Sequence, residues 1–411
     1  MKKIYLVLII LLFISSRFYH LLVLPPFLDE LIYIRWLNAI KFSRDWLLPL
    51  KEFGWEPLGI WLAGLINQIF PDPLFSLRLN SVIISFVSLI MVYRLAGNVA
   101  ALFYVLSPII LLHDRLGLRG DNLVILGALM VFYGLRQKAP VWWGLGIAIG
   151  LFSKTTAAAL PIVVILSYLW CRSKLRWPDF LAGCLSLTPI LFYALTGTLG
   201  LVINKQSTFV GDSLIKNNLL QIIPWLYQYL TWPVLLLVLG GLILSRKNKL
   251  LLLSWLVPLV LLTVSAKILF PRYLLPFIPF LLIYAADCFN WLNHQLPRVL
   301  KPLLIIFVLA PAWFSWQIST NLPAAPLPEI DQWQYVTGWP SGYGVKELID
   351  YLQANQLDQL LTYSPESLLT DTATGSAYTV TNISHEKING ELIKEFPRPG
   401  NKSGLKLWHL N

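Results

Sequence analysis

Two adjacent carboxylates, Asp29 and Glu30, follow the first long apolar run of this 411-residue chain, in the segment LDELIYIRWLNAI. An ionised side chain close to hydrocarbon is costly unless it is solvated or paired. An acid in the first turn of a helix can also cap free backbone amides, but that role explains one acid more easily than two. We therefore predict that Asp29 is a catalytic base just outside a membrane, with Glu30 as its partner.

A second charged group lies in the short segment LLHDRLGLRGDNL, residues 111–123. Arg115 and Arg119 are candidates for a phosphate site, because a guanidinium near the membrane interface binds carboxylate or phosphate through two hydrogen bonds. Lipid headgroups would satisfy the same arginines without specificity. Asp121 precedes an apolar run, so capping of the following helix is its structural alternative.

Further charges interrupt apolar sequence at Lys154, at Lys267 and Arg272, and at Glu56 in the turn that closes the first loop. Charges near a membrane indicate a functional site, although a lysine can also extend its ammonium group to the interface. An acid surrounded by cations suits a phosphate-linked lipid. The acid would activate a nucleophile, and the cations would stabilise charge on the departing phosphate. The long loop 200–228 could close over such a site.

The composition indicates a membrane protein with many spans. Hydrophobic residues make up 56% of the chain and charged residues only 13%, about half the charge of a soluble protein. The net charge of +11 is typical of basic cytoplasmic loops, so we expect no nucleic-acid partner. The three cysteines lack metal-ligand spacing. No glycine-rich phosphate loop is present, which argues against direct use of a nucleotide.

Apolar runs near the length of a bilayer crossing occur about eleven times. They cover residues 4–24, 76–93, 97–112, 121–136, 141–153, 155–170, 179–199, 229–245, 250–266, 272–289 and 302–317. The first run lacks a small-residue cleavage site, so we interpret it as an uncleaved anchor. With the N-terminus cytoplasmic, the shortest basic connections, such as the one at Arg94, fall on the cytoplasmic side. Asp29, the loop 200–228 and the C-terminal tail are then extracytoplasmic.

The loop after the first run predicts helices lying on the membrane surface. In residues 28–45 we expect Leu28, Ile32, Trp36 and Ala39 to form the apolar face, with Glu30 on the polar face. A second short helix is expected over residues 58–70. A surface connector without function is the alternative for this loop.

The tail from residue 318 is more polar and contains several prolines. A helix is expected over residues 345–353, and strands over 360–363, 377–381 and 405–410. The predicted fold is an all-α polytopic membrane protein with a small extracytoplasmic α/β C-terminal appendage, divided into domains 1–317 and 318–411. We expect the appendage to pack on the loops above the membrane.

The ordered set of these segments resembles the polyprenyl-phosphate-sugar-dependent membrane glycosyltransferases. The similarity is to bacterial relatives of the protein O-mannosyltransferase and lipid A aminoarabinose transferase family, in the C-type glycosyltransferase superfamily. The matching segments are RFYHL, LDELIYIRWLNAI, DWLLP, EPLGIWL, SPIILLHDRLGLRGDNL, GLFSKT and FPRYLLPFIPFL. They keep the family's order over most of residues 17–285, and the tail matches loosely through DQWQYVTGWPSGYG.

This resemblance implies an inverting transferase that uses a lipid-phosphate sugar at the outer face of the cell membrane. Asp29 falls on the family's catalytic base, Glu30 on its partner acid and Asp121 on a second acidic position. Arg115 or Arg119, together with Lys154, fall near its phosphate-binding positions. The family's first loop often ends in a Glu-Lys-Pro-Pro-like stretch, whereas this chain has Trp-Glu-Pro without the lysine. That departure puts in doubt a metal site at this place and a lipid A-type acceptor.

The expected function is transfer of a sugar from a polyprenyl-phosphate donor to a lipid, glycan or protein acceptor on the extracytoplasmic side. A transporter or flippase, and a polymerase or ligase of lipid-linked saccharides, are the alternatives. No cofactor is indicated with certainty. A divalent cation, held by Glu30 and Asp121, is left open.

Overall fold

The computed structural model describes residues 2–171, 174–209, 215–357, 368, 373–374, 377–382, 388–400 and 403–410. Long helices run side by side along the molecule. They are α1 (Lys2–Phe18), α5 (Pro73–Leu106), α7 (Asp121–Gln137), α8 (Pro140–Ser153), α9 (Ala159–Cys171), α10 (Trp177–Ser186), α11 (Thr188–Leu195), α14 (Trp232–Leu244), α15 (Lys249–Ser265), α16 (Ile278–Gln295) and α17 (Ile306–Thr320).

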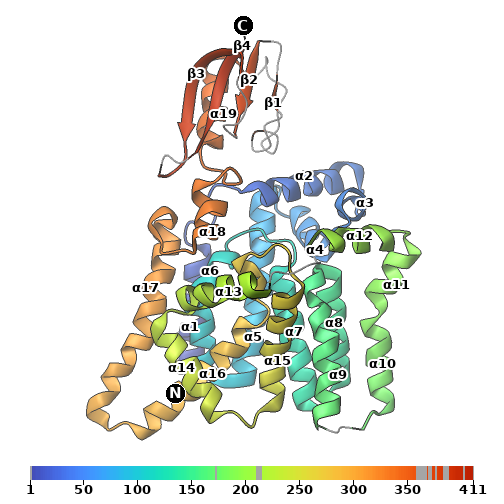
Figure 1. Cartoon of the computed structure of the whole chain (residues 1–411), viewed down its shortest axis with the longest axis vertical. Helices are drawn as coiled ribbons and strands as arrows, with labels where there is room; N and C mark the ends of the chain where they lie inside the picture. Colours follow the sequence, from blue (N-terminus) through green and yellow to red (C-terminus); the bar gives the residue numbers. More distant parts are fainter. Residues whose placement is uncertain are drawn as a thin grey trace.

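The remaining elements connect these helices or lie across one end of them. They are α2 (Leu28–Ser43), α3 (Leu48–Phe53), α4 (Leu58–Asn67), α6 (Pro108–Asp114), η1 (Thr155–Ala158), α12 (Leu199–Phe209), α13 (Ile215–Leu230), η2 (Pro271–Leu274), η3 (Arg298–Ile305), η4 (Leu322–Ala324), α18 (Glu329–Gln332) and the π-helical turn η5 (Trp333–Thr337). Figure 1 shows α2, α3, α12 and α13 across the upper end of the long helices, opposite the N-terminus.

The membrane character is confirmed, but the count of about eleven spans is not. Among the described residues, Pro73–Leu106 and Trp177–Leu195 are long and apolar enough to cross a membrane. The pair α13 and α14, bent by 107°, could form a third span. Many large apolar side chains on the outer surface are exposed, for example Leu195 at 78%. An apolar surface of this extent fits contact with lipid.

The predicted connection at Arg94 is a tight turn within α5, which breaks at Gly97. The side chains of Ser85, before the break, and Tyr104, after it, hydrogen-bond at 3.0 Å, so the chain folds back there. Gly97 has φ +80°, a conformation that glycine adopts without the steric cost of a side chain. The chain therefore changes direction there through one residue rather than through a loop.

Helix α2 confirms the predicted surface helix but not its predicted buried face. Tyr33, Trp36, Leu37 and Ile40 are buried against α4 and α5, whereas Ile32 and Ala39 are only partly buried. Glu30, expected on the polar face, is fully buried. Glu30 is buried because it forms an ion pair with Arg78 of α5, a tertiary contact that a helical wheel cannot show. Helix α4 confirms the second short helix.

The C-terminal unit consists of α19 (Val345–Ala354) and a sheet of β1 (Ala373–Thr374), β2 (Tyr378–Thr381), β3 (Gly390–Pro397) and β4 (Gly404–Leu410). The sheet order is β1-β2-β4-β3, and neighbouring strands are antiparallel. Helix α19 and strands β2 and β4 confirm the prediction. Strand β3 was missed because most of its side chains are exposed and charges interrupt its alternation. The strand expected over 360–363 lies outside the described residues.

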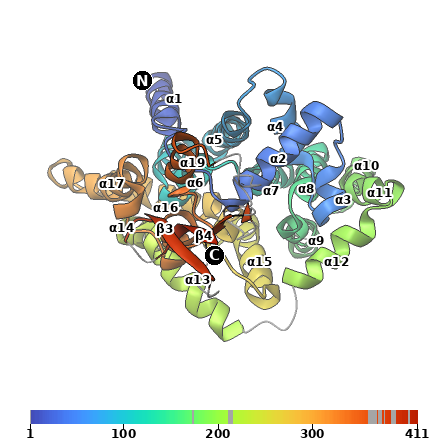
Figure 2. The same cartoon turned by 90° about the horizontal axis from the view of Figure 1, so that it is seen from above.

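This unit packs on the first loop, as expected. Leu31 of α2 belongs to the same buried cluster as Leu348 and Leu352 of α19 and Leu405 and Leu407 of β4. Viewed from above, the sheet covers part of the helical end, and α2, α3 and α12 lie beside it (Figure 2). The end of the molecule that carries Asp29 is therefore built jointly by the first loop and the C-terminal unit.

Candidate active site

Asp29 is presented by the first turn of α2, whose start is fixed on two sides. The Glu30 carboxylate accepts a hydrogen bond from the backbone amide of Phe27 at 3.3 Å, the reciprocal contact of a helix cap. The Leu28 amide donates to the Pro340 carbonyl at 2.9 Å. Asp29 itself lines a cavity and keeps 20% of its side chain exposed. Its position thus depends on both the local helix cap and the C-terminal segment.

Glu30 lies behind Asp29 and outside the cavity lining. Arg78 of α5 donates to both of its carboxylate oxygens at 2.8 Å, and the Gly117 amide donates to Oε1 at 2.7 Å. Both side chains of the pair are fully buried. Because a buried carboxylate needs such partners, Glu30 joins α2, α5 and the loop after α6 and has no access to the cavity.

A cationic side of the cavity forms around Trp55. Arg119 lies 4.7 Å from the Trp55 ring and Lys205 of α12 lies 4.8 Å from it. Both cations contact Glu56 Oε2, Arg119 at 3.0 Å and Lys205 at 3.6 Å. Glu56 is buried beneath the lining, so two cations share one carboxylate.

This arrangement requires close backbone approach at Gly59 in α4. A Cβ atom at Gly59 would lie 1.3 Å from the Arg119 carbonyl oxygen. Only glycine allows α4 to approach the loop that carries Arg119 this closely. The spacing of Arg119 relative to Glu56 is therefore set by backbone packing as well as by the ion pair.

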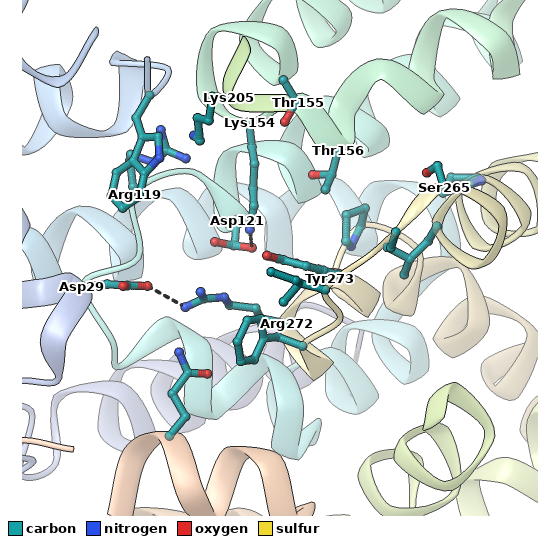
Figure 3. A pocket seen from close by; sticks show the side chains of 18 of the residues that line it. Asp29, Arg119, Asp121, Lys154, Thr155, Thr156, Lys205, Ser265, Arg272 and Tyr273 are labelled. Carbon is teal, nitrogen blue, oxygen red and sulfur yellow. Dashed lines mark hydrogen bonds and ion pairs between the residues drawn. The ribbon is translucent and has the colours of Figure 1, made fainter. Parts of the chain in front are cut away.

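Asp121 and Lys154 form a second ion pair in the lining, with 2.5 Å between Lys154 Nζ and Asp121 Oδ1. The ammonium group also lies 4.5 Å from the Tyr273 ring. Arg272 follows on the next side and pairs with Asp29 through an NH1–Oδ2 distance of 2.9 Å. Figure 3 shows these two pairs next to each other, with Arg119 and Lys205 to one side.

The cavity has a volume of about 600 Å³, within the usual range for a ligand site. Its wall opposite the charged residues is apolar and comes from η1, α9, α15 and the residues after α15. The apolar lining includes Ala158, Ala159, Ile162, Pro258, Leu261, Leu262, Ala266 and Ile268. A ligand with a charged head and a hydrocarbon tail would match these two walls.

The structure separates the residues predicted from sequence into two sets. Asp29, Arg119, Asp121, Lys154 and Arg272 line one cavity, with Glu56 directly beneath Arg119. The remaining candidates do not line it. Those are Glu30, Arg115 and Lys267.

Arg115 is removed from the site by backbone contacts. Its guanidinium donates to the carbonyls of Tyr19 at 2.8 Å, His20 at 3.0 Å and Ile318 at 3.3 Å. It therefore ties the end of α1 to α17. Lys267 is exposed on the surface after α15.

Sequence reasoning missed several cavity residues. The sequence places Lys205 only in the loop 200–228 that could close over the site, and the structure brings its side chain into the lining. Trp333, Gln334 and Trp339 lie in the aromatic segment DQWQYVTGWPSGYG and also line the cavity. Nothing local in that segment indicates which cavity its side chains reach.

Burial and charge lower the pKa of Lys205 to about 6. Removal from water is the largest cause, and the nearby Arg119 adds to it, while Glu56 acts in the opposite direction. The Lys205 side chain is therefore mostly a neutral amine at pH 7 and can take up a proton when an anion enters. Burial also raises the pKa of Tyr33, which lines the same side, so its phenol stays protonated.

The metal site considered at Glu30 and Asp121 receives no support from the geometry. Within the described parts of the chain, no three His, Cys, Asp or Glu side chains lie close enough to hold a metal ion. Glu30 is bound by Arg78, and Asp121 by Lys154. We therefore derive no step through a metal.

No protein-family model matches the chain. The undecaprenyl phosphate-alpha-4-amino-4-deoxy-L-arabinose arabinosyl transferase of Pseudomonas savastanoi pv. phaseolicola is 26% identical over 327 residues, covering 66% of this chain and 59% of the relative. The enzyme of the same name from Pseudomonas paraeruginosa is 28% identical over 193 residues, covering 41% and 35%. The chain thus spans about three fifths or less of the length of these relatives.

Two solved structures have a fold similar to that of this chain. The crystal structure of ArnT from Cupriavidus metallidurans bound to undecaprenyl phosphate matches with a TM-score of 0.53 and 17% identity, covering 87% of this chain and 72% of that one. The apo structure of the same protein matches with a TM-score of 0.52, covering 79% and 66%. The predicted resemblance is confirmed: this chain is similar in sequence to undecaprenyl phosphate-alpha-4-amino-4-deoxy-L-arabinose arabinosyl transferases and similar in fold to ArnT.

Proposed function

We propose that the chain is an inverting glycosyltransferase that moves a sugar from a polyprenyl-phosphate donor to an acceptor. One observation carries this proposal. A single cavity joins an accessible carboxylate, Asp29, to a group of cations and to an apolar wall. The names of the relatives favour a transferase over a transporter, flippase, polymerase or ligase.

The cations of the cavity suit the phosphate of such a donor. Four basic side chains line it, and three carboxylates pair with them, so one positive charge is in excess once Lys205 is protonated. A donor phosphodiester carries one negative charge. Arg119, Lys154 and Lys205 would hold it and would stabilise the second negative charge that develops when the bond to the sugar breaks.

Asp29 would take the proton of an acceptor hydroxyl while the hydroxyl oxygen attacks the anomeric carbon. The bond between that carbon and the phosphate oxygen breaks, and its electron pair leaves with the phosphate. Attack opposite to the leaving group inverts the anomeric centre. Arg272 would orient the Asp29 carboxylate through their ion pair, and Glu30 would hold the backbone that carries Asp29.

The hydrocarbon chain of the donor would lie along the apolar wall between α9 and α15. We place the cavity and the C-terminal unit on the extracytoplasmic side and the N-terminus in the cytoplasm, because the shortest loops are basic. The division into domains 1–317 and 318–411 and a count of about eleven spans belong to the same proposal.

The test is transfer of radiolabelled sugar from polyprenyl-phosphate sugars in membranes containing Asp29→Asn or wild-type protein. Because amide and carboxylate have nearly the same shape, the exchange removes mainly basicity. We expect transfer to fall about a hundredfold or more. The matched control is Asp45→Asn, which alters another acid of the first loop that pairs with Lys51 outside the cavity. Wild-type transfer by Asp29→Asn would refute the proposal.

A further inference from the structure

One wall of the cavity belongs to the connection between the long helices and the C-terminal sheet. Trp333 and Gln334 of η5, followed by Trp339 and Pro340, line the cavity beside Asp29. Trp333 and Trp339 are half-buried, and their rings meet edge to face with centroids 6.1 Å apart. We refer to Trp333, Gln334 and Trp339 as the connector wall.

The connector wall is fixed to the segment that carries Asp29. The Leu28 amide donates to the Pro340 carbonyl at 2.9 Å. The rings of Phe27 and Tyr335 meet edge to face at 5.1 Å. Tyr335 and Pro340, each adjacent in sequence to a residue of this wall, thus contact the two residues before Asp29.

The C-terminal unit holds the same turn from behind. Arg398, which is 1% exposed, donates to the carbonyls of Trp339 at 3.3 Å and Ser341 at 3.1 Å. The Asn382 side chain donates to the Trp339 carbonyl at 3.0 Å. Residues next to the strands of the C-terminal sheet therefore hold part of the cavity wall in place.

Gln334 has a hydrogen-bonding group without a partner. Its side chain is 5% exposed, yet its Oε1 accepts no hydrogen bond from the described residues. A buried amide oxygen without a donor is costly and rare. Because Gln334 lines the cavity, a hydroxyl group of a bound ligand is a chemically suitable donor.

The connector wall also lacks the cations expected of a phosphate site. Its own side chains are uncharged. Arg398 contacts it only at backbone carbonyls, and in the cavity the Arg272 guanidinium is engaged by Asp29. The other cations, Arg119, Lys154 and Lys205, lie together on one side of the Asp29–Arg272 pair (Figure 3). Indole rings offer large, rigid apolar faces. The wall therefore suits a ligand with apolar C–H faces and many hydroxyl groups.

We propose that Trp333, Gln334 and Trp339 form the acceptor subsite and that the acceptor is a saccharide. One hydroxyl donates to Gln334 Oε1, the C–H face of the ring rests on the indoles, and a second hydroxyl faces Asp29. That second hydroxyl loses its proton to Asp29 as its oxygen bonds to the anomeric carbon. This inference rests on the proposed glycosyl transfer, since it assigns the acceptor class of the same cavity.

The experiment measures binding without turnover, using the full chain in lipid nanodiscs and saturation-transfer NMR. The probes are methyl α-D-mannoside, methyl β-D-glucoside and methyl β-D-galactoside, with acetyl-Ala-Ser-Ala-amide as a peptide acceptor and glycerophosphoglycerol as a lipid headgroup. Gln334→Leu removes the amide with little change of volume. Gln332→Leu is its matched control, because Gln332 lies two residues earlier at the end of α18, bonds to the Pro323 carbonyl and does not line the cavity.

We expect at least one glycoside to bind wild type and Gln332→Leu alike. In Gln334→Leu and Trp339→Ala its dissociation constant should rise about tenfold or more, while binding of a short polyprenyl phosphate is retained and shows that the variants are folded. Loss of polyprenyl phosphate binding in Trp339→Ala leaves the decision to the isosteric Gln334→Leu. The assignment would be overturned if no glycoside bound, or if Gln334→Leu bound the glycoside as tightly as wild type. Tighter binding of the peptide or the lipid headgroup than of any glycoside would also overturn it. Since transfer by Asp29→Asn is a separate assay, failure of the subsite and failure of the transferase proposal are distinguishable.

Discussion

Acidification from pH 8 to pH 6 should strengthen binding of a lipid phosphodiester to this protein, and Lys205 is the group responsible. With its pKa lowered to about 6, Lys205 is half protonated at pH 6 and about 1% protonated at pH 8. If the anion binds the charged form, apparent affinity follows the protonated fraction. We therefore expect the dissociation constant to fall about 50-fold over this interval. The direction of this pH effect follows from the burial of Lys205. Burial lowers its pKa, so the free protein releases the Lys205 proton, and binding of the anion restores it.

The assay is equilibrium binding of a radiolabelled short-chain polyprenyl phosphodiester to the full chain in nanodiscs at pH 6, 7 and 8. A diester keeps one negative charge throughout, whereas a phosphate monoester titrates near pH 6 and would add its own pH dependence. Lys205→Arg remains charged, so its affinity should be high and independent of pH. Lys205→Met should bind weakly and also without pH dependence.

A second group could imitate this result and needs its own control. Burial raises the pKa of Asp331 to about 7, and Asp331 accepts a hydrogen bond from Tyr229 outside the cavity lining. Asp331→Asn should keep the wild-type pH profile. A wild-type profile as flat as that of Lys205→Arg, or weaker binding on acidification, would refute the reasoning from Lys205.

Arg119→Leu should weaken diester binding about tenfold or more, as measured by binding isotherms. Arg115→Leu should leave diester binding unchanged and lower the melting temperature, as measured by melting curves. A loss of binding in Arg115→Leu would contradict the structural role assigned to Arg115. Arg78→Leu leaves Glu30 buried without its cation, at a cost of about 3–5 kcal/mol. It should lower the unfolding temperature, and adding Glu30→Gln should recover part of the loss; no recovery would argue against the pair. Gly59→Ala should fail to fold because of the Arg119 carbonyl, so a monodisperse chromatographic peak at wild-type yield would be the contrary result.

The sequence by itself determined the class of protein and the approximate place of the site. Composition indicated a membrane protein, and helical spacing predicted the helices at α2, α4 and α19. The order of motifs around Asp29 indicated the similarity to the aminoarabinose transferases. These features are recoverable because they depend on local periodicity, on apolar length and on residues that stay in order along the chain.

Only the tertiary structure decided which of the charged residues face the cavity. Asp29 and Glu30 are adjacent, but successive side chains of a helix point about 100° apart, and Glu30 turns toward Arg78. Arg115 and Arg119 occur in one short segment, yet one contacts backbone carbonyls of α1 and the other contacts Glu56. The direction of each of these side chains is set by a partner that is distant in the sequence. The local sequence does not indicate which residue that partner is.

The same reason explains the residues that sequence analysis did not find. Lys205 reaches the site because α12 packs on α3, with Val202 against Leu50. Gln334 reaches it because the C-terminal unit holds its turn against the segment before Asp29. Both contacts join residues that are far apart in the sequence. They therefore depend on how whole elements pack together, which no local sequence pattern shows.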